Sequence, residues 1–250
     1  MGTLVLINAA FYATVASLAG LPQESEAEVA FVGRSNAGKS SAINVLANQR
    51  RLAYVSKTPG RTQHLNYFRV GPGRYLVDLP GYGYARAPLV QQRAWRSLAG
   101  DYLISRAALR GLILIMDIRH PLTDLDRQLL DWWRQTGKPV HVLLSKADKL
   151  SRAQALTTLR AVRAFLTGQG LPGAAQVFSA TRRLGLDEAE TVLRGWLDLG
   201  RRPHAEGDGK TPDKKNPAQG DRAGLNEPQL CVKAPAQGGE AGDESTHLTT

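Results

Sequence analysis

The sequence predicts an α/β protein built on a doubly wound, mostly parallel β-sheet. Three observations predict this fold class. Short β-rich runs alternate with longer amphipathic stretches through residues 1–200, as in chains that place helices on both faces of a sheet. A glycine-rich phosphate-loop motif lies between an apolar run and a helical one. A Gly-Pro-Gly turn at residues 71–73 predicts a hairpin, and therefore one antiparallel edge strand.

The individual elements follow from the same patterns. The β-rich runs predict strands at Val29–Gly33, Leu65–Val70, Arg74–Asp78, Leu109–Asp117, Val140–Leu144 and Gln176–Phe178. The amphipathic stretches predict helices at Lys39–Asn48, Val90–Ala107, Thr123–Gln135, Ser151–Thr167 and Leu186–Leu199. Ser151 and Gln154 have the spacing of a capping box, which marks the start of the fourth helix. One residue of the Trp132-Trp133 pair is expected in the core.

The N-terminal residues 1–23 carry no charged side chain. A secretory signal begins with a basic region, so the sequence argues against a signal peptide here. We expect a short strand at Thr3–Ile7 and then a small helix that packs on the domain.

Composition changes abruptly after residue 200. Residues 201–250 contain five Pro, seven Gly and no aromatic residue, so we predict a disordered tail behind a domain of residues 1–200. The domain has 25 basic and 14 acidic residues, a net charge of +11, whereas the tail has a net charge of −1. The lone cysteine, Cys231, excludes an internal disulfide framework. No apolar run approaches the roughly 20 residues of a membrane span.

The phosphate-loop motif G-x-x-x-x-G-K-S occupies residues 33–40. Backbone amides of such a loop bind phosphate oxygens at the positively charged end of a helix. We expect Lys39 to reach the β- and γ-phosphates and Ser40 to coordinate Mg²⁺. The residues of the loop predicted to contact the nucleotide are Gly33, Arg34, Ser35, Asn36, Ala37, Gly38, Lys39 and Ser40.

Asp78 ends a predicted strand and begins the motif Asp-Leu-Pro-Gly. Its carboxylate is placed to hold Mg²⁺ through a water molecule, and the Gly81 N–H is placed to sense the γ-phosphate. Between the two motifs lies a polar loop in which Thr62 is our candidate for a second hydroxyl on Mg²⁺, with Thr58 as the alternative. The remaining predicted nucleotide contacts of these two segments are Gly60, Arg61, Leu79 and Pro80.

A candidate base-reading site follows the apolar run Val140–Leu144. The sequence Ser145-Lys146-Ala147-Asp148 is similar to the N-K-x-D motif that reads guanine in GTPases. Asp148 can accept two hydrogen bonds from N1–H and the exocyclic amine of guanine, a donor pair that adenine does not present. A second loop, Phe178-Ser179-Ala180, is expected to present a backbone N–H to the guanine O6.

Together these motifs resemble the translation-factor-related P-loop GTPases, and more narrowly the EngB family of ribosome-biogenesis GTP-binding proteins. The narrower resemblance spans residues 3–199 and rests on the motif 33–41 with Ser41 at its end, on Thr58–Phe68, on Asp78–Ala85 and on Lys146–Lys149. It implies a Ras-like G domain that binds and hydrolyses GTP with Mg²⁺. It also implies a cytoplasmic bacterial protein that assists large ribosomal subunit assembly and is needed for cell division and septation. The family usually has Thr at the position of Ser145.

Hydrolysis is expected to be slow without a partner. Ras-like enzymes place a water-orienting glutamine after the D-x-x-G glycine, and that position is Tyr82 here. The resemblance implies a compensating K⁺ ion bound by Asn36, whereas Asn36 bonding only the loop backbone is the equally weighted alternative. We therefore predict Lys39, Thr62 and Asn36 as the residues acting in catalysis.

The basic domain predicts a polyanionic partner. Of its 25 basic residues 20 are arginines, which suit bidentate phosphate contact. Candidate contacts with ribosomal RNA are Arg50, Arg51, Arg61, Arg93, Arg96, Arg182 and Arg183. We expect GTP or GDP and a large-subunit precursor, both rRNA and ribosomal protein, as partners of a monomer that binds no DNA and inserts into no membrane.

Two other functions fit part of the sequence. A nucleotide-gated scaffold for division or membrane-surface proteins would need hydrolysis only incidentally. An ATP-dependent P-loop kinase would share the phosphate loop, but Asp148 and the lack of an obvious lid segment argue against it.

Overall fold

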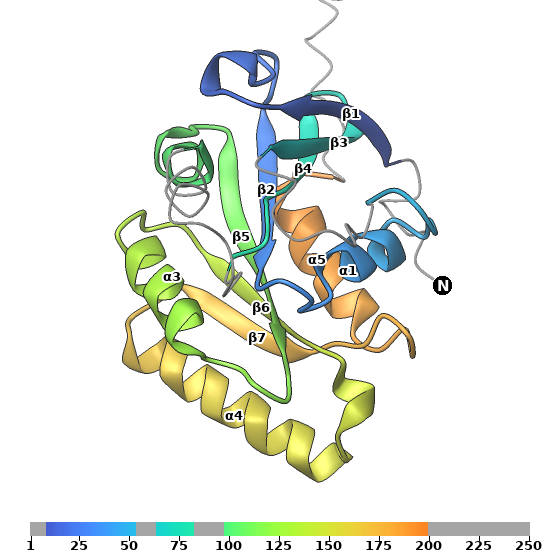
Figure 1. Cartoon of the computed structure of the whole chain (residues 1–250), viewed down its shortest axis with the longest axis vertical. Helices are drawn as coiled ribbons and strands as arrows, with labels where there is room; N and C mark the ends of the chain where they lie inside the picture. The colour runs from blue at the N-terminus through green and yellow to red at the C-terminus, as the bar shows by residue number, and fades with distance from the viewer. Residues whose placement is uncertain (1–8, 54–63, 83–97, 200–250) are drawn as a thin grey trace, which may run out of the picture. The chain divides into compact units, whose positions relative to one another are not determined.

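The protein is built on a seven-stranded β-sheet (Figure 1). The computed structural model describes residues 9–53, 64–82 and 98–199. The sheet order is β1-β3-β4-β2-β5-β6-β7, in which β2, β4, β5, β6 and β7 are parallel neighbours and β3 is antiparallel to β1 and β4. The strands are β1 (Ala10–Val15), β2 (Ala27–Gly33), β3 (Leu65–Gly71), β4 (Arg74–Asp78), β5 (Leu109–Asp117), β6 (Val140–Ser145) and β7 (Gly173–Val177).

Helices cover both faces of this sheet. They are α1 (Lys39–Leu46), α3 (Asp124–Arg134), α4 (Arg152–Gly168) and α5 (Leu186–Trp196), with a further helical segment at residues 98–105. Short 3-10 turns occur at Leu18–Gly20 and Ala147–Lys149. In Figure 1, α1 and α5 cover one face while α3 and α4 cover the other. Two buried hydrophobic clusters fill the two interfaces, one with Ile43 and Leu193, the other with Trp133 and Val162.

The predicted fold class is confirmed, and the predicted hairpin gives the sheet one antiparallel strand, β3, which lies next to the edge strand β1. The capping box of Ser151 and Gln154 is also confirmed, because Ser151 accepts from the Gln154 N–H at 3.3 Å and the Gln154 side chain accepts from the Ser151 N–H at 3.0 Å. Trp133 is fully buried, as expected for one of the two tryptophans. None of the described helices is long and apolar enough to cross a membrane.

The small helix predicted after the first strand is wrong for residues 10–15, which form strand β1, and only a 3-10 turn follows at Leu18–Gly20. Aromatic and β-branched residues dominate this segment and favour a pleated strand. β1 pairs antiparallel with the outer side of β3, with Phe11 opposite Phe68 and Val15 opposite Leu65. The strand predicted at Thr3–Ile7 lies outside the described residues, as do much of the Val90–Ala107 helix and the tail predicted at 201–250.

The last strand also differs from its prediction, since β7 begins at Gly173 and ends at Val177. A side chain at Gly173 would place its Cβ 2.4 Å from the main-chain oxygen of Val140. Glycine therefore lets β7 approach β6 closely, although it weakened the strand signal of the sequence.

A buried polar cluster lies near the start of β2. Glu28 on β2 is 0% exposed and forms an ion pair with Arg106, with an N···O distance of 2.6 Å. The hydroxyls of Tyr102 and Tyr67 donate to the second carboxylate oxygen at 2.8 and 3.2 Å. Burial and the neighbouring Glu28 charge raise the pKa of both phenols, so they stay neutral donors to the carboxylate.

Candidate nucleotide-binding site

The carboxyl ends of the parallel strands lie on the same side of the sheet, and ligands bind at these ends in sheets of this topology. Gly33 ends β2, Asp78 ends β4, Asp117 ends β5, Ser145 ends β6 and Val177 ends β7. All of the predicted phosphate and base motifs in the described residues follow these strand ends. The fold therefore brings together segments that are far apart in the sequence.

The backbone of the phosphate loop requires glycine at two positions, Gly33 and Gly38. A Cβ at Gly33 would lie 2.6 Å from the main-chain oxygen of Ile115, so a larger residue would push β5 away. Gly38 has a φ of +102°, which glycine adopts without strain. Helix α1 begins at the next residue, so the backbone amides at its first turn are available to an anion.

Lys39 and Asp78 form an ion pair across the site. Lys39 stands at the first turn of α1, and Asp78 is the last residue of β4. The neighbouring Ser40 hydroxyl and the Asp78 carboxylate are hard oxygen ligands, the type that Mg²⁺ prefers when it also binds phosphate. These two residues fit a magnesium ion held mainly by the nucleotide, and no group of three or more acidic, His or Cys side chains in the described residues offers an alternative metal site.

The Asp-Leu-Pro-Gly segment lies directly alongside the phosphate loop. The Tyr82 N–H donates to the Gly33 oxygen at 3.3 Å, and the Ser35 N–H donates to the Tyr82 oxygen at 3.0 Å. This pairing brings Gly81 close to the loop. A Cβ atom placed on Gly81 would lie 3.4 Å from the main-chain nitrogen of Ser35. The Gly81 amide is thereby placed beside the loop that is to hold phosphate.

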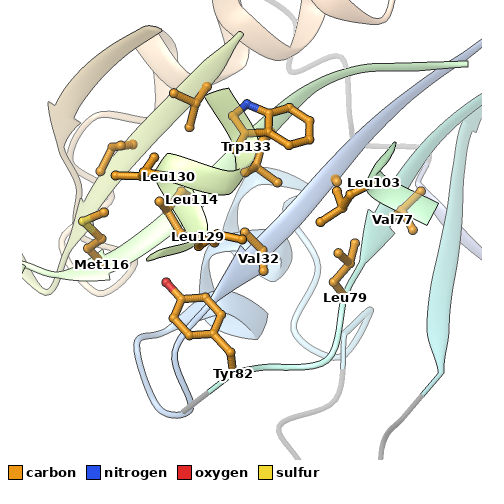
Figure 2. Close-up of a cluster of buried hydrophobic side chains, with 14 of the residues drawn as sticks. Val32, Val77, Leu79, Tyr82, Leu103, Leu114, Met116, Leu129, Leu130 and Trp133 are labelled. Carbon is orange, nitrogen blue, oxygen red and sulfur yellow. The ribbon is translucent and has the colours of Figure 1, made fainter. Parts of the chain in front are cut away.

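The Tyr82 side chain points away from this loop into the core. Figure 2 shows its ring beside Val32 and Leu129 in a buried hydrophobic cluster. Its hydroxyl donates to a carboxylate oxygen of Asp126 on α3 at 2.5 Å. Burial and the Asp126 charge raise the pKa of the Tyr82 phenol, so it remains a neutral donor. Tyr82 is therefore a structural anchor whose hydroxyl proton is committed to Asp126.

Lys146 connects the base-reading loop to the phosphate loop. Its ammonium donates to the Asn36 oxygen at 2.7 Å and lies 3.0 Å from a carboxylate oxygen of Asp117. Asp117 in turn accepts two hydrogen bonds from the Arg119 guanidinium, at 2.9 and 2.6 Å. The Arg119 contact, followed by that of Lys146, holds the pKa of the Asp117 carboxyl well below its usual range. The sequence analysis missed Asp117, although an acidic residue ending a long apolar strand was a usable signal.

Ser145 makes a second connection between the same two loops. It is 3% exposed, and its hydroxyl lies within hydrogen-bonding distance of the main-chain oxygens of Ala37, at 2.5 Å, and Met116, at 3.0 Å. Both partners are acceptors, so the hydroxyl supplies one proton to the pair. The hydroxyl therefore acts on the protein backbone, and a threonine at this position would keep the same group.

Asp148 is held by the loop that follows β7. The Ser179 hydroxyl donates to an Asp148 carboxylate oxygen at 2.5 Å, and this hydrogen bond lowers the pKa of Asp148. The backbone of Phe178 joins the two loops, because its N–H donates to Leu144 at 2.9 Å and its oxygen accepts from the Ala147 N–H at 3.1 Å. The Phe178 ring is buried, so this residue supports the site through its backbone.

The structure thus gathers most of the predicted site in one place. The phosphate loop, Asp78–Gly81, Ser145–Asp148 and Phe178–Ala180 all meet at the strand ends. Gly60, Arg61 and Thr62, with the alternative Thr58, lie outside the described residues, so the second magnesium ligand stays a prediction.

Comparison with known proteins identifies the family. Residues 28–146 match the family model described as "50S ribosome-binding GTPase". The chain is 55% identical over 215 residues to the "Probable GTP-binding protein EngB" of Nitrosomonas europaea, covering 86% of this chain and 97% of that protein. It is 57% identical over 194 residues to the protein of that name from Dechloromonas aromatica, covering 77% and 88%. The chain belongs to the EngB family of GTP-binding proteins.

The solved structures agree with the fold of an EngB-family chain. The crystal structure of a probable GTP-binding protein engB superposes with a TM-score of 0.56 at 18% identity, covering 69% of this chain and 100% of that one. The domain is a P-loop GTPase domain, and the chain is an enzyme that hydrolyses GTP. GTPases of this kind use Mg²⁺ with the nucleotide, which agrees with the oxygen ligands of Ser40 and Asp78.

Proposed function

We propose that this EngB-family chain is a GTP-dependent switch in the assembly of the large ribosomal subunit of a bacterial cytoplasm. The observation that carries the proposal is that hydrogen bonds join the predicted base-binding loop to the phosphate loop. Lys146 and Ser145 tie the base-reading loop to the phosphate loop, so a bound guanine and a bound phosphate chain act on one connected unit. The match to a family of 50S ribosome-binding GTPases supports a ribosomal partner, and the family resemblance suggests a role in cell division and septation.

In this proposal each residue has a defined role. Lys39 binds the β- and γ-phosphates, Ser40 and Thr62 supply hydroxyls to Mg²⁺, and Asp78 holds the ion through water. Asp148 accepts the two guanine donors, and the Ala180 N–H donates to O6. Mg²⁺ supplies positive charge at the phosphates when the nucleotide binds, while the chain itself positions the base and the phosphate chain.

Slow hydrolysis follows from the position of Tyr82, whose hydroxyl is committed to Asp126. We propose that Asn36 provides a ligand for K⁺, which would stabilise charge between the β- and γ-phosphates. Asn36 has a φ of 63°, and its main-chain oxygen binds Lys146. Turnover in KCl should exceed that in NaCl for the wild type and not for Asn36→Ala. Equal turnover of the wild type in the two salts would exclude this role.

The switch itself is tested by sucrose-gradient fractionation of cell extracts with added protein. Association with large-subunit particles should be stronger with a non-hydrolysable GTP analogue than with GDP. Asp148→Asn serves as the matched control, because its phosphate loop is intact while its guanine recognition is weakened. Association that is the same with both nucleotides would overturn the proposal.

A further inference from the structure

Two loops next to the nucleotide site meet at an exposed surface. One is the segment 48–53 that follows α1, and the other is the segment 179–184 between β7 and α5. They are in contact, since the Arg183 guanidinium donates to the Asn48 side-chain oxygen at 3.4 Å. In Figure 1 the orange segment before α5 lies beside the blue α1. Four exposed arginines stand on these loops, Arg50, Arg51, Arg182 and Arg183, and we call them the arginine cluster.

The first loop is fixed so that its arginines face outward. Leu52 and Ala53 are buried in the core between the sheet and α1. The Asn44 side chain accepts from the Ala53 N–H at 2.7 Å and donates to the Ala53 oxygen at 2.9 Å. Because the residues that follow them are anchored in this way, Arg50 and Arg51 remain on the surface.

The second loop is closed at its base. The backbones of Ser179 and Leu184 exchange two hydrogen bonds, at 3.1 and 3.0 Å. Arg183 has a φ of +54°, a conformation that is uncommon for a residue other than glycine. The loop therefore holds Arg182 and Arg183 at its tip in one defined arrangement, which lowers the entropy lost when they bind a partner.

The charge of the cluster is uncompensated. Among the described residues, none of the four cluster arginines has a carboxylate within 4.0 Å, in contrast to Arg74, Arg106 and Arg119. Other arginines in that part of the chain, such as Arg152 and Arg160, also have no ion pair, and the cluster differs from them in placing four such side chains on two loops that touch. A guanidinium presents a planar set of donors that matches a phosphate group. No aromatic residue occurs in the two loops, so base stacking has no platform there.

We propose that the arginine cluster is an RNA-binding surface that contacts the phosphate backbone. The proposal rests on the proposed function for the identity of the polyanion, because RNA is the main component of a ribosomal precursor. Recognition through the backbone predicts binding that is strongly salt-dependent and only weakly sequence-dependent.

Two charge-neutralising variants, Arg50→Gln/Arg51→Gln and Arg182→Gln/Arg183→Gln, test the surface in the full chain. The matched control is Arg134→Gln/Arg194→Gln, which removes the same two charges from exposed helix positions that have ion pairs. The probe is a fluorescent 24-base-pair RNA duplex titrated at several KCl concentrations. Each cluster variant should weaken binding at least about fivefold and reduce the salt slope by roughly one to two, while the control changes affinity less than about twofold.

Thermal melting and GDP affinity test whether the variants are folded, since none of these residues is among the predicted nucleotide contacts. Equal weakening by the cluster and control variants would mean that only net charge matters, and the proposal would fail. It would also fail if the cluster variants bind RNA normally but lose their association with large-subunit particles, because the partner would then be protein. A third outcome separates the two proposals. If the cluster variants lose RNA binding, but the wild type associates equally with large-subunit particles in GDP and in the GTP analogue, the RNA-binding surface is supported and the switch proposal is excluded.

Discussion

The ammonium of Lys146 lies 3.0 Å from a carboxylate oxygen of Asp117 while it donates to the main chain of Asn36 in the phosphate loop. Lys146 adopts a left-handed backbone conformation, with a φ of 57°, which is uncommon for a lysine. Asp117 is in turn held by Arg119 through two hydrogen bonds. Asp117 therefore positions the lysine that joins the two halves of the nucleotide site.

We predict that Asp117→Asn weakens GDP binding about tenfold, because a hydrogen bond to a charged group contributes about 1.5–3 kcal/mol. The loss should be equal for GDP and IDP, since Asp117 acts through Lys146 and does not read the exocyclic amine that inosine lacks. Asp148→Asn should instead reduce the preference for GDP over IDP. Competition against a fluorescent GDP analogue measures both effects, with Asp131→Asn, an exposed carboxylate on α3, as the control.

Tyr82→Phe should destabilise the fold and leave hydrolysis almost unchanged. Asp126 is 1% exposed, and the substitution removes one of its hydrogen-bond donors. Loss of a hydrogen bond to a buried carboxylate should lower the free energy of unfolding by about 1–3 kcal/mol in urea titrations. GTP turnover should stay within about twofold of the wild type at a temperature where both are folded. A tenfold loss of turnover would show that the phenol takes part in hydrolysis.

The buried ion pair of Glu28 and Arg106 provides a stability test. Glu28→Gln leaves the Arg106 charge without its partner in a mostly buried position, so the free energy of unfolding should fall by about 3 kcal/mol. Glu26→Gln is the control, because Glu26 pairs with Arg74 on the surface and should contribute less than about 1 kcal/mol. Similar losses for the two variants would contradict the role assigned to the buried cluster.

His141 should make stability depend on pH. It is buried on β6, with its Nε2 2.7 Å from the Gln176 side-chain oxygen, and burial lowers its pKa below the ordinary value of about 6.5. The unfolded chain therefore binds a proton more readily than the folded one, so stability is full above pH 6.5 and falls as the pH drops toward the folded-state pKa. The expected slope is at most about 1.4 kcal/mol per pH unit.

His141→Asn should flatten this dependence between pH 7.5 and 5.5 in urea titrations, while the exposed His120→Asn should keep it. An unchanged slope in His141→Asn would assign the proton uptake to another group.

The sequence was most informative where a motif has a fixed backbone requirement. The phosphate loop, Asp78 and Asp148 were found at the strand ends where the motifs placed them, because glycines and strand-terminal carboxylates have few alternative uses in that order. The small helix predicted near the N-terminus was wrong where strand β1 forms, since an apolar, charge-free composition does not distinguish a helix from a strand. β1 is stabilised by pairing with the distant β3.

Contacts between distant residues were the part that the sequence could not predict. Nothing local to Tyr82 indicates that its hydroxyl binds Asp126, and nothing local to Asp117 indicates Lys146 as its partner. Such pairs depend on the order of strands in the sheet, which places the ends of β5 and β6 side by side. The prediction that Tyr82 lacks a role like that of the Ras glutamine agrees with its contacts, but its anchoring role needed the structure.

One hydroxyl group links Asp148, the carboxylate predicted to bind guanine, to the arginine cluster. Ser179 donates to Asp148 and accepts from the Arg182 N–H at 3.2 Å, so the two sites are separated by a single side chain. A ligand that fixes the position of Asp148 would therefore also restrict the conformations open to Arg182, and the reverse would hold as well. An occupied base pocket would then restrict the tip of the loop in a conformation that suits a polyanion, and a docked polyanion would raise the affinity for the nucleotide by the same factor.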